Sequence, residues 1–145
     1  MREDDISGSI PPRIKIRGIL ETVMSEAKKS KRYDLEERTF KFANDVRNFV
    51  KLLPKSTANT EDIKQVVRSS GSVGANYIEA NEAVSKKDFL LRIKISRKEA
   101  KESKFWLDLL DTGGDERLER LREKLVQETV ELMKIFSSIM RSSNS

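Results

Sequence analysis

The sequence predicts an all-α protein that folds as an antiparallel up-and-down four-helix bundle. Three observations support this fold class. The 145 residues include only six Gly and three Pro and are rich in Glu, Lys, Arg, Leu and Ser, a composition typical of helical proteins. Apolar residues recur at alternating spacings of four and three along four segments, which is the period of one helix face. Short stretches that contain Pro or Gly separate these segments, so each segment is expected to form one helix.

The first two predicted helices lie on either side of a turn with the sequence PKSTAN. Asp34 is expected to cap the first helix, with Glu37 in the capping-box position, and Pro54 marks its end. The predicted buried stripe of this helix comprises Leu35, Thr39, Phe42, Val46, Phe49 and Leu53. The second helix is expected to start at Asn59 or Thr60. Its predicted inward side comprises Ile63, Val66, Val67, Ser70, Val73, Gly74, Tyr77 and Ile78.

The third and fourth predicted helices each have a clear start signal. Ser85, with Asp88 three residues later, is expected to cap the third helix. The pair Gly113–Gly114 breaks the chain, and Asp115 is expected to cap the fourth helix. The predicted stripe of the third helix comprises Phe89, Ile93, Ser96, Ala100, Ser103, Leu107 and Leu110. The predicted stripe of the fourth comprises Leu118, Leu121, Leu125, Glu128, Leu132, Ile135 and Ile139.

The domain organisation follows from where the helical period begins and ends. Residues 34–141 are expected to form the bundle, and residues 142–145 a frayed tail. Residues 1–33 contain two prolines and no sustained period, so we expect a flexible or partly helical extension. This extension opens with acidic residues and lacks an apolar core segment, unlike a signal peptide. No apolar run approaches the roughly 20 residues of a membrane span, and a cytoplasmic location is expected.

The composition disfavours most routes to catalysis. The chain has no Cys and no His, which removes thiol nucleophiles, imidazole bases and the common zinc and di-iron ligand sets. Glu79 and Glu82, three residues apart, leave open a carboxylate-only metal or nucleotide site, although capping, ion pairing or simple solvation is the more ordinary explanation. We therefore expect no enzymatic activity and no cofactor.

The charge of the chain is concentrated in two places. Residues 1–33 contain eight basic and five acidic side chains, so they supply +3 of the net charge of +5. The segment Lys86–Lys104 holds eight basic residues against three acidic ones. With the apolar stripe of the third helix turned inward, one outward sector carries lysines that suit a phosphate backbone. These lysines are Lys87, Lys94, Lys98 and Lys101, and the alternative is a merely solvated helix face. A basic cluster before the first helix, Lys28, Lys29, Lys31 and Arg32, could add contacts.

Two features of the pattern indicate a homo-oligomer. The third helix carries a second apolar row that a bundle monomer does not need to bury, and such a surface implies a partner. The row comprises Leu91, Ile95, Phe105 and Leu109, beside Trp106. The second helix contains Gly71 and Gly74, which cost about 1 kcal/mol each relative to Ala. Close packing of a neighbouring helix would offset this cost, and it is favoured over a nucleic-acid-binding GxxG loop because no strands are predicted.

Long stretches of the chain resemble a known family. Residues 33–54, YDLEERTFKFANDVRNFVKLLP, and the run RSSGSVGANYIEA followed by SKKDF and RKEAKES are similar to the bacterial four-helix-bundle proteins encoded in intervening sequences of 23S ribosomal RNA genes. The resemblance covers about three-quarters of the chain and has no counterpart for residues 1–30. It implies a ring-like homopentamer and no assigned catalytic residues. Related accessory proteins of diversity-generating retroelements bind nucleic acid through a basic surface, which points here to the third helix and Arg68.

Two functions are compatible with these observations. The favoured one is a non-enzymatic oligomer that binds structured, rRNA-like RNA by charge, without sequence specificity. Its predicted contacts are Lys87, Lys94, Lys98, Lys101 and Arg68, and its predicted subunit interface is Leu91, Ile95, Phe105 and Trp106. The alternative is a scaffold or accessory factor whose basic face meets an acidic protein encoded by a mobile element, such as a reverse transcriptase.

Overall fold

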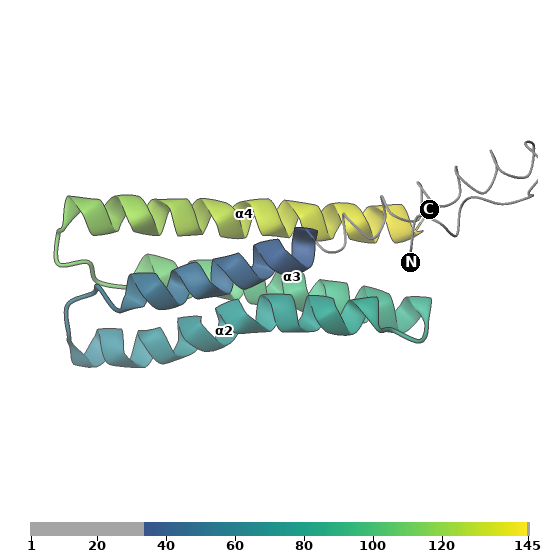
Figure 1. Ribbon diagram of the computed structural model, residues 1–145, viewed down its shortest axis with the longest axis horizontal. Helices are drawn as coiled ribbons and strands as arrows, with labels where there is room; N and C mark the ends of the chain where they lie inside the picture. Colours follow the sequence, from purple (N-terminus) through teal and green to yellow (C-terminus); the bar gives the residue numbers. More distant parts are fainter. Residues whose placement is uncertain (1–33, 145) are drawn as a thin grey trace, which may run out of the picture. The chain divides into compact units, whose positions relative to one another are not determined.

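In the part of the chain that the structure describes, four helices lie side by side, and successive helices run in opposite directions (Figure 1). The structure, a computed structural model, describes residues 34–144, and within this range it contains helices and connecting turns but no strand. The first helix is described over residues 34–50, followed by α2 (Thr57–Asn81), α3 (Lys86–Leu109) and α4 (Glu116–Asn144). The predicted four-helix bundle is therefore confirmed. None of the described helices combines the length and the hydropathy that crossing a membrane requires.

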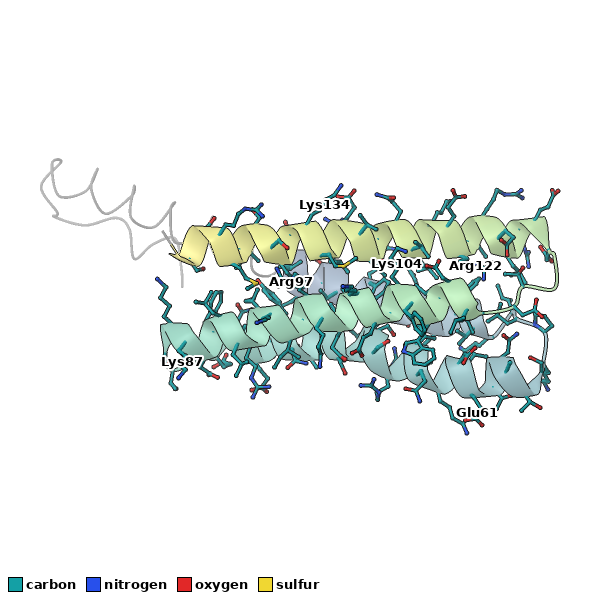
Figure 2. The ribbon with its side chains drawn as sticks, turned by 180° about the vertical axis from the view of Figure 1, so that it is seen from behind. Glu61, Lys87, Arg97, Lys104, Arg122 and Lys134 are labelled. Carbon is teal, nitrogen blue, oxygen red and sulfur yellow. The ribbon has the colours of Figure 1, made fainter. Side chains whose placement is uncertain are left out.

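The first helix and α3 occupy opposite corners of the bundle. The first helix is joined to α2 by the Arg47 side chain, whose Nη2 donates to the Val67 carbonyl at 3.3 Å. It is joined to α4 by a two-pronged ion pair between Arg38 and Glu128, with both N···O distances 2.8 Å. α3 also contacts α2 and α4. The first helix faces the viewer in Figure 1, and α3 faces the viewer in the reverse view of Figure 2.

Two of the predicted helix starts are confirmed. The Ser85 hydroxyl accepts a hydrogen bond from the Asp88 amide at 3.1 Å, directly before α3. The Asp115 carboxylate accepts from the Leu118 amide at 3.1 Å, directly before α4. The turn between these helices contains Gly113–Gly114 with φ of 69° and 78°, a backbone conformation that favours glycine. Local capping chemistry therefore sets both starts, as the sequence indicates.

The start of α2 differs from the prediction. The helix begins at Thr57, because the Ser56 hydroxyl accepts from the Asn59 amide at 3.1 Å and acts as the cap. The predicted start at Asn59 or Thr60 is therefore wrong by two or three residues. Asn59 is instead almost fully buried, with 2% of its surface exposed, in a network described below.

The two ends of the bundle also differ from the prediction. Asp34 is already helical, so it does not precede the first helix as a cap. α4 continues to Asn144, and the Ser143 hydroxyl donates to the Ile139 carbonyl at 2.9 Å, as helical serines commonly do. The predicted frayed tail from residue 142 is therefore helical as far as Asn144. The predicted extension, residues 1–33, lies outside the described residues.

The core contains apolar side chains from all four helices, including Phe42, Val66, Ile93 and Leu132. Every residue of the predicted stripe of the first helix is buried. The prediction for α3 is confirmed as well, with Phe89 packed half-buried against the core.

In α2 and α4 the predicted stripe is partly wrong. Ile78 is 50% exposed, while Ser69, which was not predicted to face inward, is fully buried. In α4 the fully buried positions are Thr129 and Phe136 rather than Glu128 and Ile135. Because 3.6 residues per turn does not divide seven, the inward face moves by one residue along a helix of this length.

The first helix approaches α2 closely at Gly74. A Cβ atom there would lie 2.8 Å from the Thr39 hydroxyl of the first helix and 3.1 Å from the Thr39 Cβ. The predicted close packing of a neighbouring helix is therefore confirmed at this position. On its α3 side, α2 makes contacts through small hydroxyl side chains. Ser96 donates to the Val73 carbonyl at 2.9 Å, and the hydroxyls of Ser69 and Ser103 lie 2.9 Å apart.

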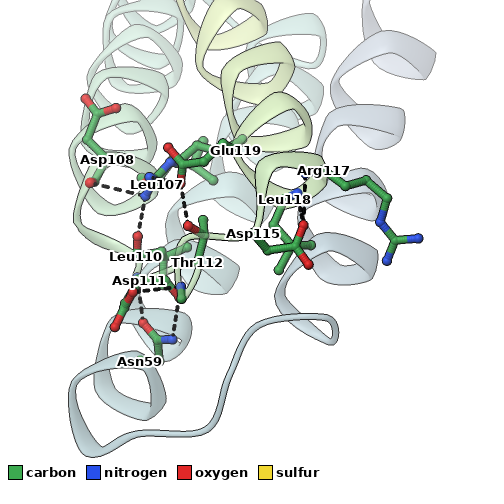
Figure 3. A network of polar contacts seen from close by, with 12 residues as sticks. Asn59, Leu107, Asp108, Leu110, Asp111, Thr112, Asp115, Arg117, Leu118 and Glu119 are labelled. Atoms are coloured by element: carbon green, nitrogen blue, oxygen red, sulfur yellow. Dashed lines mark hydrogen bonds and ion pairs between the residues drawn. The ribbon is translucent and has the colours of Figure 1, made fainter.

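The two turns at one end of the bundle are joined by the Asn59 side chain (Figure 3). Its amide nitrogen donates to the carbonyls of Pro54 at 2.8 Å and Asp111 at 2.9 Å. Its amide oxygen accepts from the Asp111 backbone N–H at 2.9 Å. One buried amide therefore connects the turn before α2 with the turn after α3.

A second set of contacts closes the C-terminal end of α3. The Arg122 guanidinium donates to the carbonyls of Leu107, at 3.4 Å, and Leu110, so a cation satisfies the last carbonyls of the helix. Arg122 also pairs with Glu119, which accepts from the Thr112 hydroxyl. These hydrogen bonds, from Arg122 first and Thr112 second, lower the pKa of Glu119.

Candidate nucleic-acid interface

A groove with a volume of about 890 Å³ is lined by residues of α3 and α4. No acidic side chain is among the lining residues. Six lining residues are basic: Lys94, Arg97, Lys98, Lys101, Lys134 and Arg141. Four are apolar: Leu91, Ile95, Val130 and Met133. We call this feature the α3–α4 groove.

The inward residues of α3 determine where its basic residues lie. Ile93, Ser96 and Ala100 are fully buried, so the residues on the opposite side of the helix face away from the core. Lys94, Lys98 and Lys101, which we call the groove lysines, follow one another at spacings of four and three and are all exposed.

α4 supplies the other wall of the groove with the same helical spacing. Val130, Lys134, Ser137 and Arg141 recur at intervals of four, three and four. α3 and α4 contact each other and run in opposite directions (Figure 1), and basic residues of both helices line the same groove, so the two sets lie along each other.

Arg97 connects the two walls. It lies between α3 and α4 in Figure 2, and its Nη1 donates to the Ser137 hydroxyl at 3.2 Å. Lys134 is 3.9 Å from the Glu131 carboxylate. Among residues 34–144, neither the groove lysines nor Arg141 is joined to an acidic side chain by an ion pair. Four of the six basic groups therefore have their charge available for an anionic ligand.

Two of the predicted contact residues lie outside the groove. Lys87 is exposed in the first turn of α3, at the end of the helix in Figure 2. Arg68 projects from α2 and forms ion pairs with Glu99 at 3.6 Å and Glu102 at 3.7 Å. Arg68 is thus paired with acidic residues of α3, and the groove lysines are not.

Glu99 marks the acidic side of α3. Its side chain is 5% exposed, and burial raises the pKa of Glu99, as does its contact with the Glu102 carboxyl. Arg68 and Lys98 act in the opposite direction on this pKa. The basic surface of α3 is therefore bounded by carboxyl groups on its α2 side and continues onto α4 on the other.

Sequence reasoning missed the contribution of Arg97, Lys134 and Arg141. The recurrence of Val130, Lys134, Ser137 and Arg141 beside the buried stripe of α4 is a periodic signal that could have indicated a second basic row. The prediction placed the contacts on α3, on Arg68 of α2 and in the basic cluster before the first helix, and it did not consider α4.

The predicted subunit interface is divided into two places. Leu91, 54% exposed, and the half-buried Ile95 line the α3–α4 groove. Phe105, 58% exposed, lies nearer the C-terminal end of α3 and packs edge-on against Trp106, with ring centroids 5.0 Å apart. Trp106 itself packs partly against the core.

The alternative carboxylate site gains no further ligands. Glu79 and Glu82 are both exposed at the end of α2. Within residues 34–144 no group of three or more Asp, Glu, His or Cys side chains is arranged to hold a metal ion. The basic cluster at residues 28–32 lies outside the described part of the chain.

Comparisons with known proteins agree with this architecture. The model of the 23S rRNA-intervening sequence protein family matches residues 31–138. A crystal structure of a protein of unknown function from the S23 ribosomal protein family of Bacteroides thetaiotaomicron VPI-5482 is similar, with 30% sequence identity and a TM-score of 0.61. The similarity covers 72% of this chain and 96% of that one. A search of curated proteins found no match.

Proposed function

The chain belongs to the 23S rRNA-intervening sequence protein family, and from this premise we propose that it is a non-enzymatic protein that binds structured RNA through the α3–α4 groove. The RNA is rRNA-like, and recognition is by charge rather than by sequence. An RNA partner of this kind implies a cytoplasmic location.

The concentration of unpaired positive charge in the groove is the observation that carries the proposal. Residues 34–145 hold 21 basic and 19 acidic side chains, so the bundle as a whole is nearly neutral. The groove lining nevertheless has six basic residues and no acidic one. A local cation cluster on a nearly neutral bundle directs a polyanion to one surface of that bundle.

The chemistry of the lining favours contacts with phosphate over contacts with bases. No aromatic side chain lines the groove to stack on an unpaired base. Lysine acts as a mobile point charge that suits phosphate oxygens. If the groove lysines and Arg141 each neutralise one phosphate, the slope of log affinity against log salt concentration is about −4.

A charge-reversal experiment tests the proposal. Fluorescence anisotropy of a labelled RNA hairpin is measured for the unaltered protein and for a variant in which the groove lysines are changed to Glu. The matched control changes Lys51, Lys55 and Lys124 to Glu, since these lysines are exposed outside the groove and give the same change in net charge. Circular dichroism checks that both variants remain helical.

The groove variant is expected to bind at least about tenfold more weakly than the control variant and to have a smaller salt slope. Equal weakening of both variants would mean that RNA responds only to net charge. Unchanged binding by the groove variant would show that RNA does not bind through the α3–α4 groove. Lys87 and Arg68 stay as predicted additional contacts, to be tested by single substitution in the same assay.

Self-association is the second part of the proposal. Phe105 and Leu109 are 58% and 51% exposed on α3, and large apolar side chains grouped on a surface are typical of a protein contact. The family resemblance implies a homopentamer. Sedimentation equilibrium of the unaltered protein and of Phe105→Glu tests this part, with a single monomeric species for both proteins as the contradicting result.

A further inference from the structure

Arg97 differs from the other basic residues that line the α3–α4 groove. Those residues are exposed, whereas Arg97 is half-buried and lies between the two helices (Figure 2). Its Nη1 donates to the Ser137 hydroxyl at 3.2 Å, so a residue of α4 holds the guanidinium in place. A hydroxyl is neutral, and this contact therefore does not neutralise the charge of Arg97. A guanidinium has several N–H donors in one plane, which leaves donors for a ligand in the groove.

The Ser137 hydroxyl can contact the same ligand. Its oxygen accepts from Arg97, and a hydroxyl also carries a hydrogen that it can donate. The two walls of the groove thus bring a charged planar donor and a neutral O–H donor together at one point. Phosphate oxygens accept hydrogen bonds from both kinds of donor, and an Arg fork can bind two of them at once.

Three exposed cations surround the contact between Arg97 and Ser137. Lys94 precedes Arg97 by three residues and Lys101 follows it by four, so they lie one turn away on either side along α3. Arg141 follows Ser137 by four residues and lies one turn away along α4. Within residues 34–144, none of these three cations forms an ion pair with an acidic side chain. Positive charge is therefore concentrated around one point of the groove.

Apolar side chains of the groove lining lie close to this point. Ile95 of α3 and Met133 of α4 are both half-buried there. Met133 precedes Ser137 by four residues, so the two side chains are neighbours on one face of α4. An apolar environment strengthens hydrogen bonds to a charged group, because less water competes for the donors. The lining therefore favours a close contact with a single anionic group at Arg97.

A phosphate at the end of an RNA strand fits this point better than a phosphate within the strand. An internal phosphodiester has one negative charge and a sugar on each side. A phosphomonoester has a charge of about −1.5 to −2 at neutral pH, three free oxygens and a sugar on one side only, so it can reach a half-buried fork. We infer that Arg97 and Ser137 bind the phosphomonoester at the 5′ or 3′ end of an RNA strand. The inference rests on the proposed RNA binding and names the group that the groove recognises.

Three RNA hairpins that differ only at their ends test the inference. One has hydroxyls at both ends, one a 5′-phosphate and one a 3′-phosphate, and each carries its fluorophore in the loop. Fluorescence anisotropy gives the affinity of each hairpin for the unaltered protein and for Arg97→Lys, which keeps the charge but loses the planar fork. The matched control is Arg92→Lys, because Arg92 is also half-buried on α3 and its Nη1 donates at 3.2 Å to the Asn76 side chain of α2. Circular dichroism checks that both variants remain helical.

The unaltered protein and Arg92→Lys are expected to bind a phosphorylated hairpin about tenfold more tightly than the hydroxyl hairpin, and the better of the two phosphorylated hairpins identifies the end. Arg97→Lys is expected to bind all three hairpins with similar affinity. Equal binding of the three hairpins by the unaltered protein would overturn the inference and leave RNA binding by the groove in place. A preference that survives in Arg97→Lys, or that both variants lose equally, would do the same. Failure of the unaltered protein to bind any hairpin would overturn the inference and the proposed function together.

Discussion

Removing the Asn59 side chain is expected to destabilise the end of the bundle where it joins two turns. Asn59→Ala deletes three hydrogen bonds, two donated to the carbonyls of Pro54 and Asp111 and one accepted from the Asp111 amide. All three have donor–acceptor distances of 2.8–2.9 Å, and the residue is 2% exposed. The two turns would then no longer be held together by side-chain contacts at this point.

The magnitude follows from the number of groups left without a partner. A hydrogen bond contributes about 1 kcal/mol net, and a buried group left unpaired costs about 1–3 kcal/mol. Asp111 is exposed, so water can reach some of the freed groups and the lower end of that range applies. We therefore expect Asn59→Ala to lower the free energy of unfolding by about 3 kcal/mol.

Urea unfolding followed by circular dichroism measures this loss. With a urea dependence of about 2 kcal/mol per molar, the midpoint is expected to fall by about 1.5 M. Asn48→Ala is the matched control, because Asn48 is an exposed asparagine of the first helix. Asn59→Asp keeps the acceptor but loses both donated bonds, and it should be destabilised to a similar degree. If Asn59→Ala and Asn48→Ala unfold at the same midpoint, the network does not stabilise the fold and the reasoning is wrong.

Three further predictions concern α2 and α3. Gly74→Ala is expected to cost about 1–2 kcal/mol because the new Cβ meets Thr39, whereas Gly71→Ala should be nearly neutral, and equal melting temperatures would contradict this. Burial and a neighbouring carboxyl raise the pKa of Glu99 in the folded protein. The protonated Glu99 side chain therefore contributes fully to stability below the pKa of the unfolded state, about 4.3, and this contribution is lost as the pH rises through the folded-state pKa. Glu99→Gln should therefore melt at progressively higher temperature relative to the unaltered protein as pH rises, and parallel pH profiles would refute this. Ser85→Ala removes the cap of α3 and should cost about 1 kcal/mol in urea unfolding, with no measurable change as the contradicting result.

The fold was predictable because burial along a helix repeats with a fixed period. Phe42, Val46 and Phe49 recur at four and three, and all are buried as that spacing predicts. The same rule fails in detail where a long helix shifts its inward face, so Phe136 rather than Ile135 is buried in α4. The period identifies the buried face of a helix, and packing against the neighbouring helices determines which residues lie at the edge of that face.

The candidate site was predictable only in part. The groove lysines share one helix, so their spacing alone brings them together. Lys134 and Arg141 join them through the packing of α3 against α4, which no local pattern encodes. Asn59 illustrates the same limit, because it resembles a helix-start residue and its partner Asp111 is 52 residues away.

The hydroxyl contacts between α2 and α3 also fix the register of the two helices. An interface made only of aliphatic side chains could slide by one turn, about 5.4 Å, and still exclude water. Here such a slip would take the Ser96 hydroxyl away from the Val73 carbonyl and separate the hydroxyls of Ser69 and Ser103, so hydrogen bonds between buried groups of the two helices would be lost. Since Lys94 and Lys98 lie on the same helix as Ser96 and Ser103, the register of α3 against α2 also determines where along α2 these positive charges stand.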